Sequence, residues 1–539
     1  MNRKPEPCYT CRNRRIQCDQ SGVPCRKCQN AGLECLDQRP LRWVKGVAIR
    51  GKMQGRSFEK NEKNSSLLKS DNKVSAIQRS VTRAKPTSGS PRSGLDFNGK
   101  MNTIHESIMG KEFGLFLHSI SEPSVALEDP SLLNLDRVSR YYIDYYNERI
   151  CKLFIVYDSD KNPFRSLIPM GMKNPVLLKA LLALAARHHV NTGQSFDNPE
   201  MSTAPGFINA HRDALSLKHQ AMEALSHSLR GSQSCNQDTT VASIFLLIFL
   251  DLIESGSDGW NFHLEGAKKL IASTYPQVEN QAGINQGPGE TLQEIRSFIT
   301  RQIYLIETLG AAFSRPKLLT QSSLFDQQEM QLHETVEKSF LGCPEYILTA
   351  IQCLSFHRDS ITASITLDDT GIASHRTDTE SLLDLLQNFD DYTWASNVQS
   401  SRDSSLQDIA NLCMLSQAYK LGAYIYGRRI LDALTQTESV QDRSVSELLG
   451  LINFLKDDPA LFKCILWPVF VAGLECKWQA QRDFLVGCLE RFWSLTSCLN
   501  GVNAAKILQE YWQQGDLSHN PQSQWIFNIG NLGRDWLWI

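Results

Sequence analysis

The chain has 539 residues, more than one hydrophobic core usually organises, so we expect at least two structural units. With 42% hydrophobic and 21% charged residues, its composition is typical of globular proteins. Neither a secretory signal nor a membrane span is expected: the first residues, MNRKPEPC, contain no apolar run, and the longest such run, 241–250, is too short to cross a bilayer. We therefore expect a soluble intracellular protein with no membrane partner.

Charge is divided unevenly along the chain, although the net charge is only −2. Residues 1–100 contain 22 Lys and Arg against 8 Asp and Glu, and the remainder is acidic. A basic region on an acidic body indicates that this region has a polyanionic partner.

Six of the fifteen cysteines lie within residues 8–35, where the pattern C-x2-C-x6-C occurs twice. A C-x-x-C turn presents two thiolates to one ion, and a following helical segment is expected to return a third to the same side. A closed zinc site needs four ligands, so two sites need eight thiolates unless two are shared. Cys8 and Cys25, which are equivalent in the repeat, are the natural shared ligands. The expected metal ligands are Cys8, Cys11, Cys18, Cys25, Cys28 and Cys35.

Two other uses of six clustered cysteines remain open at this point. Disulfides could pair them in fifteen ways, but disulfides need an oxidising compartment and nothing in the sequence exports the chain. A single zinc ion or an iron–sulfur cluster is the other alternative. The spacing favours two zinc ions.

Basic residues lie within each half of the repeat. The segment RNRRIQ, between Cys11 and Cys18, places three arginines on an expected short helix, and Arg26 and Lys27 occupy the second C-x-x-C turn. On an element held rigid by metal, such residues are suited to the major groove of double-stranded DNA. We therefore expect DNA as the polyanionic partner.

The six cysteines and the basic segment after Cys11 resemble the fungal zinc binuclear cluster transcription factors. The resemblance implies two Zn(II) ions, bridged by Cys8 and Cys25, and a nuclear protein. It also implies that Arg14 and Arg15 read the bases of a CGG-like triplet. Gln17 departs from the family, which commonly has Lys or Arg there. By the same resemblance, one ion is completed by Cys11 and Cys18 and the other by Cys28 and Cys35.

A basic arm is expected at residues 41–56. Its sequence LRWVKGVAIRGKMQG resembles the extension that follows the cluster in one large group of filamentous-fungal members. It nearly satisfies a nucleotide-binding P-loop pattern, but Met53 stands where a hydroxyl should hold Mg²⁺, so phosphate contacts with DNA are favoured. The residues expected to contact DNA are Arg12, Arg14, Arg15, Arg26, Lys27, Lys45, Arg50 and Lys52.

The rest of the chain is expected to be a flexible linker followed by a large all-α multi-helix domain. Residues 57–128 are rich in Ser, Asn, Lys and Gly and contain no sustained heptad. Beyond them, helical periodicity marks 174–189, 206–229, 241–254, 290–313, 404–437, 446–456, 460–478 and 480–500. KNPFRSLIPM, WNFHLEGAKKLI and WPVFVAGLEC resemble the helical regulatory domain of the same fungal group. The expected division is 1–40 cluster, 41–56 basic arm, 57–128 linker and 129–539 helical domain.

The helical region contains no sequence pattern that indicates catalysis. H-E-x-x-H, G-x-S-x-G and G-x-G-x-x-G are all absent. His188 and His189 end a core helix, where capping or solvent contact is expected. Cys464, Cys476, Cys488 and Cys498 are spaced too widely for a metal site and are expected to be buried apolar side chains. We do not expect an enzyme.

The interpretation favoured by the sequence is a nuclear, sequence-specific DNA-binding transcription regulator of the fungal RNA polymerase II type. A homodimer formed through the helical domain and contacts with the transcription machinery are the further partners considered. The alternative is an interaction or sensor protein whose zinc cluster binds nucleic acid non-specifically while the helical body acts through partners.

Overall fold

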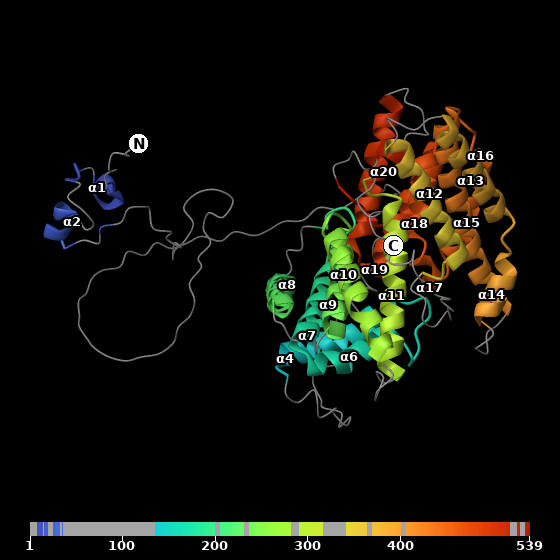
Figure 1. Ribbon diagram of the computed structural model, residues 1–539. Helices are drawn as coiled ribbons and strands as arrows, with labels where there is room; N and C mark the ends of the chain where they lie inside the picture. The colour runs from blue at the N-terminus through green and yellow to red at the C-terminus, as the bar shows by residue number, and fades with distance from the viewer. Residues whose placement is uncertain are drawn as a thin grey trace, which may run out of the picture. The chain divides into compact units, whose positions relative to one another are not determined.

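The computed structural model describes residues 8–14, 16–19, 25–32, 35, 135–199, 205–230, 237–281, 290–315, 341–363, 369–399, 406–517, 525–528 and 534–539. The chain divides into two compact units, residues 1–117 and 118–539, which are described separately (Figure 1). Within the described ranges no helix combines the length and the apolar character that crossing a membrane requires.

The first unit contains two one-turn helices, α1 (Tyr9–Asn13) and α2 (Arg26–Asn30), each beginning inside a C-x-x-C segment. Helix α1 is shorter than expected: it ends at Asn13, so the basic segment that was expected to be helical continues past the helix end. The physical reason is that the chain must turn back to bring Cys18 to the other cysteines. Gly32, with φ of +61°, lies just beyond the end of α2, in a conformation that glycine adopts without strain.

The described part of the second unit contains helices and a single isolated β-bridge, between Ser257 and Trp536, but no strand, which confirms the expected all-α domain. Its first half comprises α4 (Arg137–Tyr145), the π-helical turn η2 (Tyr146–Ile150), α5 (Cys151–Leu153), α6 (Pro163–Lys173), α7 (Pro175–Asn191), α8 (Pro205–Arg230), α9 (Gln237–Glu254), α10 (Gly259–Gln281) and α11 (Glu290–Ala311). Its second half comprises α12 (Glu345–Ala363), α13 (Asp369–Gln387), α14 (Asp391–Gln399), α15 (Leu406–Thr435), α16 (Asp442–Leu455), α17 (Pro459–Phe462), α18 (Leu466–Glu475), α19 (Gln479–Thr496), α20 (Leu499–Leu517) and α21 (Trp525–Asn528).

The central helices are those whose sequences are apolar on most faces. The Asn174 side chain caps α7 by accepting hydrogen bonds from the N–H groups of Val176 and Leu177, and Pro175 occupies the first turn, where its missing N–H costs nothing. Helix α9 is buried on every side from Thr240 to Ile253. A helix that is apolar all round must lie inside the domain, and α9 does so.

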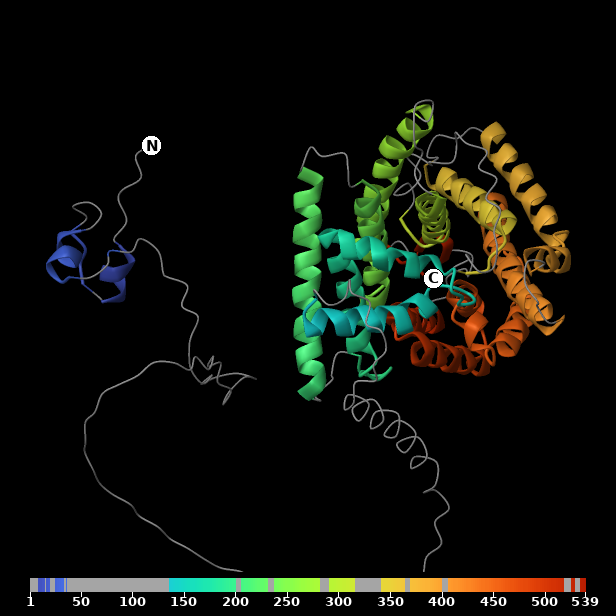
Figure 2. The same ribbon diagram turned by 90° about the horizontal axis from the view of Figure 1, so that it is seen from below.

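The two halves of this domain share one hydrophobic core. Helix α7 packs against α4, α6, α8 and α9, while α15 packs against α12, α13, α14, α16 and α18 (Figures 1 and 2). Polar contacts also join the halves, since the Asn191 side chain donates to the carbonyls of Ile253 and Ser497 at 2.8 and 2.9 Å. One buried cluster therefore extends from Tyr142 to Ile539.

The last residues, 534–539, complete that core as an extended segment. The Asp535 carboxylate accepts hydrogen bonds from Arg315 at 2.8 Å and Asn261 at 3.1 Å, and Leu537 and Trp538 are buried. The carbonyl of Ile539 accepts from Asn500 at 3.0 Å. The end of the chain is thus held by both halves of the domain.

Two expected helices end earlier than their apolar pattern suggested. The stretch 460–478 is divided into α17 and α18, because the chain turns between Phe462 and Leu466. The stretch 480–500 stops at Ser497, whose φ of +48° ends α19 before α20 begins. Apolar periodicity continued across both turns because Cys464 and Ile465 in the first turn and Cys498 in the second are buried.

The histidine at the end of α7 has a different role from the one expected. The His188 side chain is buried; its Nδ1 lies 2.7 Å from the Tyr145 hydroxyl and its Nε2 lies 2.9 Å from the Thr496 carbonyl oxygen. It therefore neither caps the helix nor contacts solvent but links α4, α7 and α19. The burial of Cys464, Cys476, Cys488 and Cys498, by contrast, confirms their expected role.

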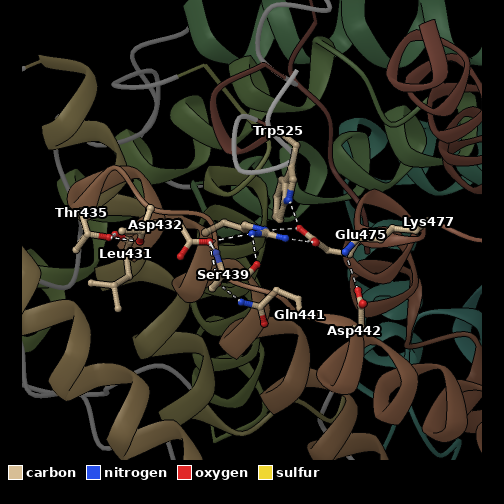
Figure 3. Close-up of polar contacts among 11 residues, drawn as sticks. Leu431, Asp432, Thr435, Ser439, Gln441, Asp442, Glu475, Lys477 and Trp525 are labelled. Atoms are coloured by element: carbon tan, nitrogen blue, oxygen red, sulfur yellow. Dashed lines mark hydrogen bonds and ion pairs between the residues drawn. The ribbon is translucent and has the colours of Figure 1, made fainter. Parts of the chain in front are cut away.

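A buried ion network ties α15 to α18 and was not expected from the sequence. The Arg429 guanidinium donates to both oxygens of Glu475, at 2.8 and 2.5 Å, and to Asp432 at 2.8 Å. The Trp525 indole N–H also donates to Glu475, at 2.6 Å, and the Ser439 hydroxyl donates to Asp432 at 2.8 Å (Figure 3). Because its charges are paired and hydrogen-bonded, the network can remain ionised away from water.

Candidate metal centre and nucleic-acid interface

In each half of the cysteine repeat, the first cysteine is the N-cap of a short helix. Cys8 and Cys25 are the N-caps of α1 and α2, and their sulfurs accept hydrogen bonds from the backbone N–H of Cys11 and Cys28, both at 3.4 Å. The C-x-x-C spacing equals the spacing from an N-cap to the third helical residue, which explains why each motif forms a turn of helix. Sequence reasoning did not single out these two backbone donors, although the spacing contains the signal.

The six sulfurs form one compact cluster with two overlapping groups of four. One group is Cys8, Cys11, Cys18 and Cys25; the other is Cys8, Cys25, Cys28 and Cys35; within each, all ligand atoms lie within 4.8 Å of one another. The shared members are Cys8 and Cys25, whose sulfurs are 3.9 Å apart.

The distances between sulfurs suit tetrahedral zinc. Zn–S bonds of about 2.3 Å place two thiolates of one tetrahedron roughly 3.8 Å apart. The Cys8 sulfur lies 3.7 Å from that of Cys28 and 3.9 Å from that of Cys18, and the Cys11 sulfur lies 3.7 Å from that of Cys25. Cys11 is also 3.7 Å from Cys28, so the two groups form a single centre. A set of six clustered thiols is a donor set that zinc prefers.

The thiols of the cluster differ in their proton affinity. The backbone N–H of Cys11 lowers the pKa of Cys8, and the backbone N–H of Cys28 lowers that of Cys25. Burial raises the pKa of Cys11 well above its usual range and that of Cys28 to about 12. Compared with Cys11 and Cys28, the two shared thiols are therefore favoured as thiolates, the form that binds metal.

The described basic residues lie on the surface of this unit. Arg12 is in the last turn of α1, Arg14 is its C-cap, and Arg26 and Lys27 open α2; all four are exposed, as is Gln17. The helices thus turn cysteines inward and basic side chains outward. The other residues expected to contact DNA, namely Arg15, Lys45, Arg50 and Lys52, lie outside the described residues, as does the P-loop-like segment of the arm.

Comparison with known proteins identifies both units. Residues 6–43 match the fungal Zn(2)-Cys(6) binuclear cluster domain, and residues 140–538 match the fungal specific transcription factor domain. The chain is 24% identical to the acriflavine sensitivity control protein acr-2 of Neurospora crassa over 597 aligned residues, which cover 99% of this chain and 95% of that protein. No solved structure matches the chain.

The metal centre and the helical domain define a class, the DNA-binding transcription regulators. The chain belongs to the fungal family named by its larger domain, the fungal specific transcription factors, because that match covers well over half of its length. The binuclear domain binds two zinc ions, and the family consists of transcription factors rather than enzymes.

Proposed function

We propose that the chain is a nuclear regulator that recognises a CGG-like triplet in the major groove through the segment that follows Cys11. Arg14 and Arg15 are the base-reading residues, since the planar guanidinium can donate two hydrogen bonds to guanine O6 and N7. The observation that carries the proposal is the geometry of the cluster: two four-thiol groups share Cys8 and Cys25, and exposed basic residues flank them.

Each cysteine has a distinct role in this proposal. Cys8 and Cys25 bridge the two ions, Cys11 and Cys18 complete one site, and Cys28 and Cys35 complete the other. The sharing of Cys8 and Cys25 between the two thiol groups supports this assignment. Zinc then fixes the spacing of α1 and α2, which have no other buried contacts to hold them within the described residues of this unit.

The remaining basic residues are assigned to phosphates. Arg12, Arg26 and Lys27 lie around the cluster, and Lys45, Arg50 and Lys52 belong to the arm. Phosphate contacts orient a protein on the duplex without selecting sequence, whereas base contacts select it. The division of the chain that supports this function is a cluster at 1–40, an arm at 41–56, a linker at 57–128 and a helical domain at 129–539.

The helical domain, in this proposal, forms a homodimer and contacts the transcription machinery. The described part of the first unit contains no dimerisation helix, because α1 and α2 have five residues each. Two copies that pair through the helical domain can place two clusters on two half-sites of one DNA molecule.

Binding-site selection from random DNA, with the full chain, tests the function. Enrichment of a CGG-like triplet is expected, and Arg14→Ala or Arg15→Ala should weaken binding to the selected site by about 1–3 kcal/mol while changing binding to scrambled DNA little. Lys52→Ala is the matched control: it should weaken binding to both sequences alike and reduce the salt slope by about one. Salt-sensitive binding without any enriched sequence would support the alternative, an interaction or sensor protein.

A further inference from the structure

Helix α8 (Pro205–Arg230) has two apolar faces, and the domain uses only one. Ala210, Ala214, Ala221 and Leu225 are buried against the neighbouring helices α7 and α9. Lys218 strengthens this attachment through its ion pair with Glu254. The helix is therefore already fixed to the domain by one face.

The second face is a straight apolar stripe on the exposed side. It consists of Ile208, Leu215, Met222 and Leu229, whose exposed fractions are 60%, 55%, 39% and 53%. Successive members are seven residues apart, which is two helical turns less about 20°, so the stripe extends along nearly the whole helix. Leu215 follows the buried Ala214 and so points about 100° away from it around the helix axis.

This stripe differs from the scattered apolar residues found on any surface. Among the described helices no other has more than two exposed large apolar side chains. Figures 1 and 2 place α8 at the edge of the helical domain, with α7 and α9 on one side of it. Isolated exposed apolar residues need no explanation, but a heptad stripe on an edge helix does.

We propose that the stripe is the contact by which two copies of this chain pair, α8 against α8, in antiparallel orientation. The inference deepens the proposed homodimer and rests on it. Of the described helices, α8 itself is the one that offers a matching stripe. A two-fold axis near residues 218 and 219 sets Ile208 against Leu229 of the second copy and Leu215 against Met222, so each side chain meets an apolar one.

Charge favours this orientation over the parallel one. Arg212 and Glu223 are both exposed and lie on the same flank of the stripe. In the antiparallel pair, each Arg212 lies within roughly 3 Å, measured along the helix axis, of Glu223 of the other copy, and this contact occurs twice. A parallel pair would instead place Arg212 at the level of Arg212 in the other copy and Glu223 at the level of Glu223, so that like charges share one level along the helix axis.

The size of the contact predicts a weak dimer that DNA strengthens. One helix pair lies at the low end of the roughly 1,200–2,000 Å² that stable interfaces bury, so dimerisation is expected at micromolar concentration. Two copies bound to neighbouring half-sites have a far higher effective concentration, and the stripe then makes their binding cooperative.

Sedimentation of the full chain measures the dimer directly. The double variant Leu215→Glu/Met222→Glu should raise its dissociation constant at least about tenfold, because the pair would bury carboxylates against apolar groups. Phe262→Glu, at a single exposed position on α10, is the matched control and should leave the dimer unchanged. A wild type that stays monomeric in solution and on paired half-sites, or a double variant that dimerises as well as the wild type, overturns the proposal.

Cross-linking tests the orientation and does not depend on the variants weakening the dimer. His219→Cys lies near the two-fold axis and should form a disulfide with its copy, whereas Arg230→Cys should not, since the two positions would be about 35 Å apart. Cross-linking at 230 but not at 219 contradicts the antiparallel pair. The stripe variants should bind a single half-site as well as the wild type does. A wild-type chain that does not bind a single half-site would instead refute the proposed DNA recognition.

Discussion

The two described units of this protein are stabilised in opposite ways. In the first, the buried side chains are the four cysteines Cys8, Cys11, Cys25 and Cys28, with Cys18 and Cys35 against them. In the second, one apolar core extends from α4 to the end of the chain and includes large side chains such as Phe249, Trp260 and Trp467. The first unit therefore depends on metal for its fold, while the second depends on the burial of apolar surface.

This difference explains what each unit can do. A metal-held unit needs almost no core, so its side chains are available on the surface, and Arg14, Arg26 and Lys27 are all exposed. The helical domain uses most of its side chains for packing, which leaves its edges, such as α8, for contacts with other molecules. Four changes to the protein test this contrast, beginning at the metal centre.

Replacing a shared cysteine should have the largest effect. Each structural zinc contributes roughly 10–16 kcal/mol to folding in small zinc domains, so losing both ions unfolds the first unit. We expect Cys25→Ser in the full chain to remove both zinc ions. Cys35→Ser should leave part of the zinc bound at the other site, the one that Cys11 and Cys18 complete. Metal analysis of the purified protein measures this. Cys413→Ser, in α15, is the control and should retain two zinc ions; one zinc retained by Cys25→Ser would contradict the sharing.

Breaking the buried ion network should destabilise the helical domain alone. Arg429→Ala leaves Glu475 and Asp432 buried without their cationic partner. This should lower the free energy of unfolding by about 3–5 kcal/mol, measured by urea unfolding with the helical signal as the probe. Arg443→Ala removes an exposed pair with Glu447 and should cost at most about 1 kcal/mol. An equal loss of unfolding free energy in the two variants would contradict the stabilising role of the network. Both variants should still bind two zinc ions.

The buried histidine should make the helical domain sensitive to acid. Burial lowers the pKa of His188 from 6.5 to about 4, so between these values the unfolded chain binds more protons than the folded one. The contribution of neutral His188 to the free energy of unfolding is therefore fully present above pH 6.5 and is lost as the pH falls toward 4. Between pH 7 and 4.5 the wild type should lose about 2–3 kcal/mol more than His188→Gln. His211→Gln, at an exposed position, should keep the wild-type dependence; the same slope in all three proteins would contradict this role.

Two glycine substitutions should have small and opposite effects on the stability of the helical domain. A Cβ on Gly310 would lie 2.4 Å from Cη2 of Trp260, so Gly310→Ala should destabilise the domain by about 1–3 kcal/mol through overpacking. A Cβ on Gly266 would meet nothing within 4 Å, so Gly266→Ala in α10 should stabilise it by about 0.5–1 kcal/mol. Thermal unfolding measures both, and a shift of the same sign in the two variants would contradict the packing described here.

Local patterns predicted the parts of this structure that depend on local physics. The cysteine spacing predicted the two C-x-x-C turns, and the helical periodicity of 174–189 predicted α7, which begins at Pro175. The end of α1, the break between α17 and α18 and the role of His188 depend on distant residues, such as Cys18 and Thr496, that a local pattern does not contain. The network around Arg429 joins residues 46 positions apart in the chain, and the heptad on α8 was hidden by the stronger core-facing periodicity of the same helix.

Removal of zinc from the full chain shows whether the two units depend on different sources of stability, if DNA binding and helical content are followed in the same titration with a chelator. We expect the preference for the selected sequence to disappear as two zinc ions per chain are lost, while the far-ultraviolet helical signal and its urea midpoint stay unchanged. Unfolding of the helical domain together with zinc loss, or a sequence preference that persists in the metal-free protein, would contradict the account.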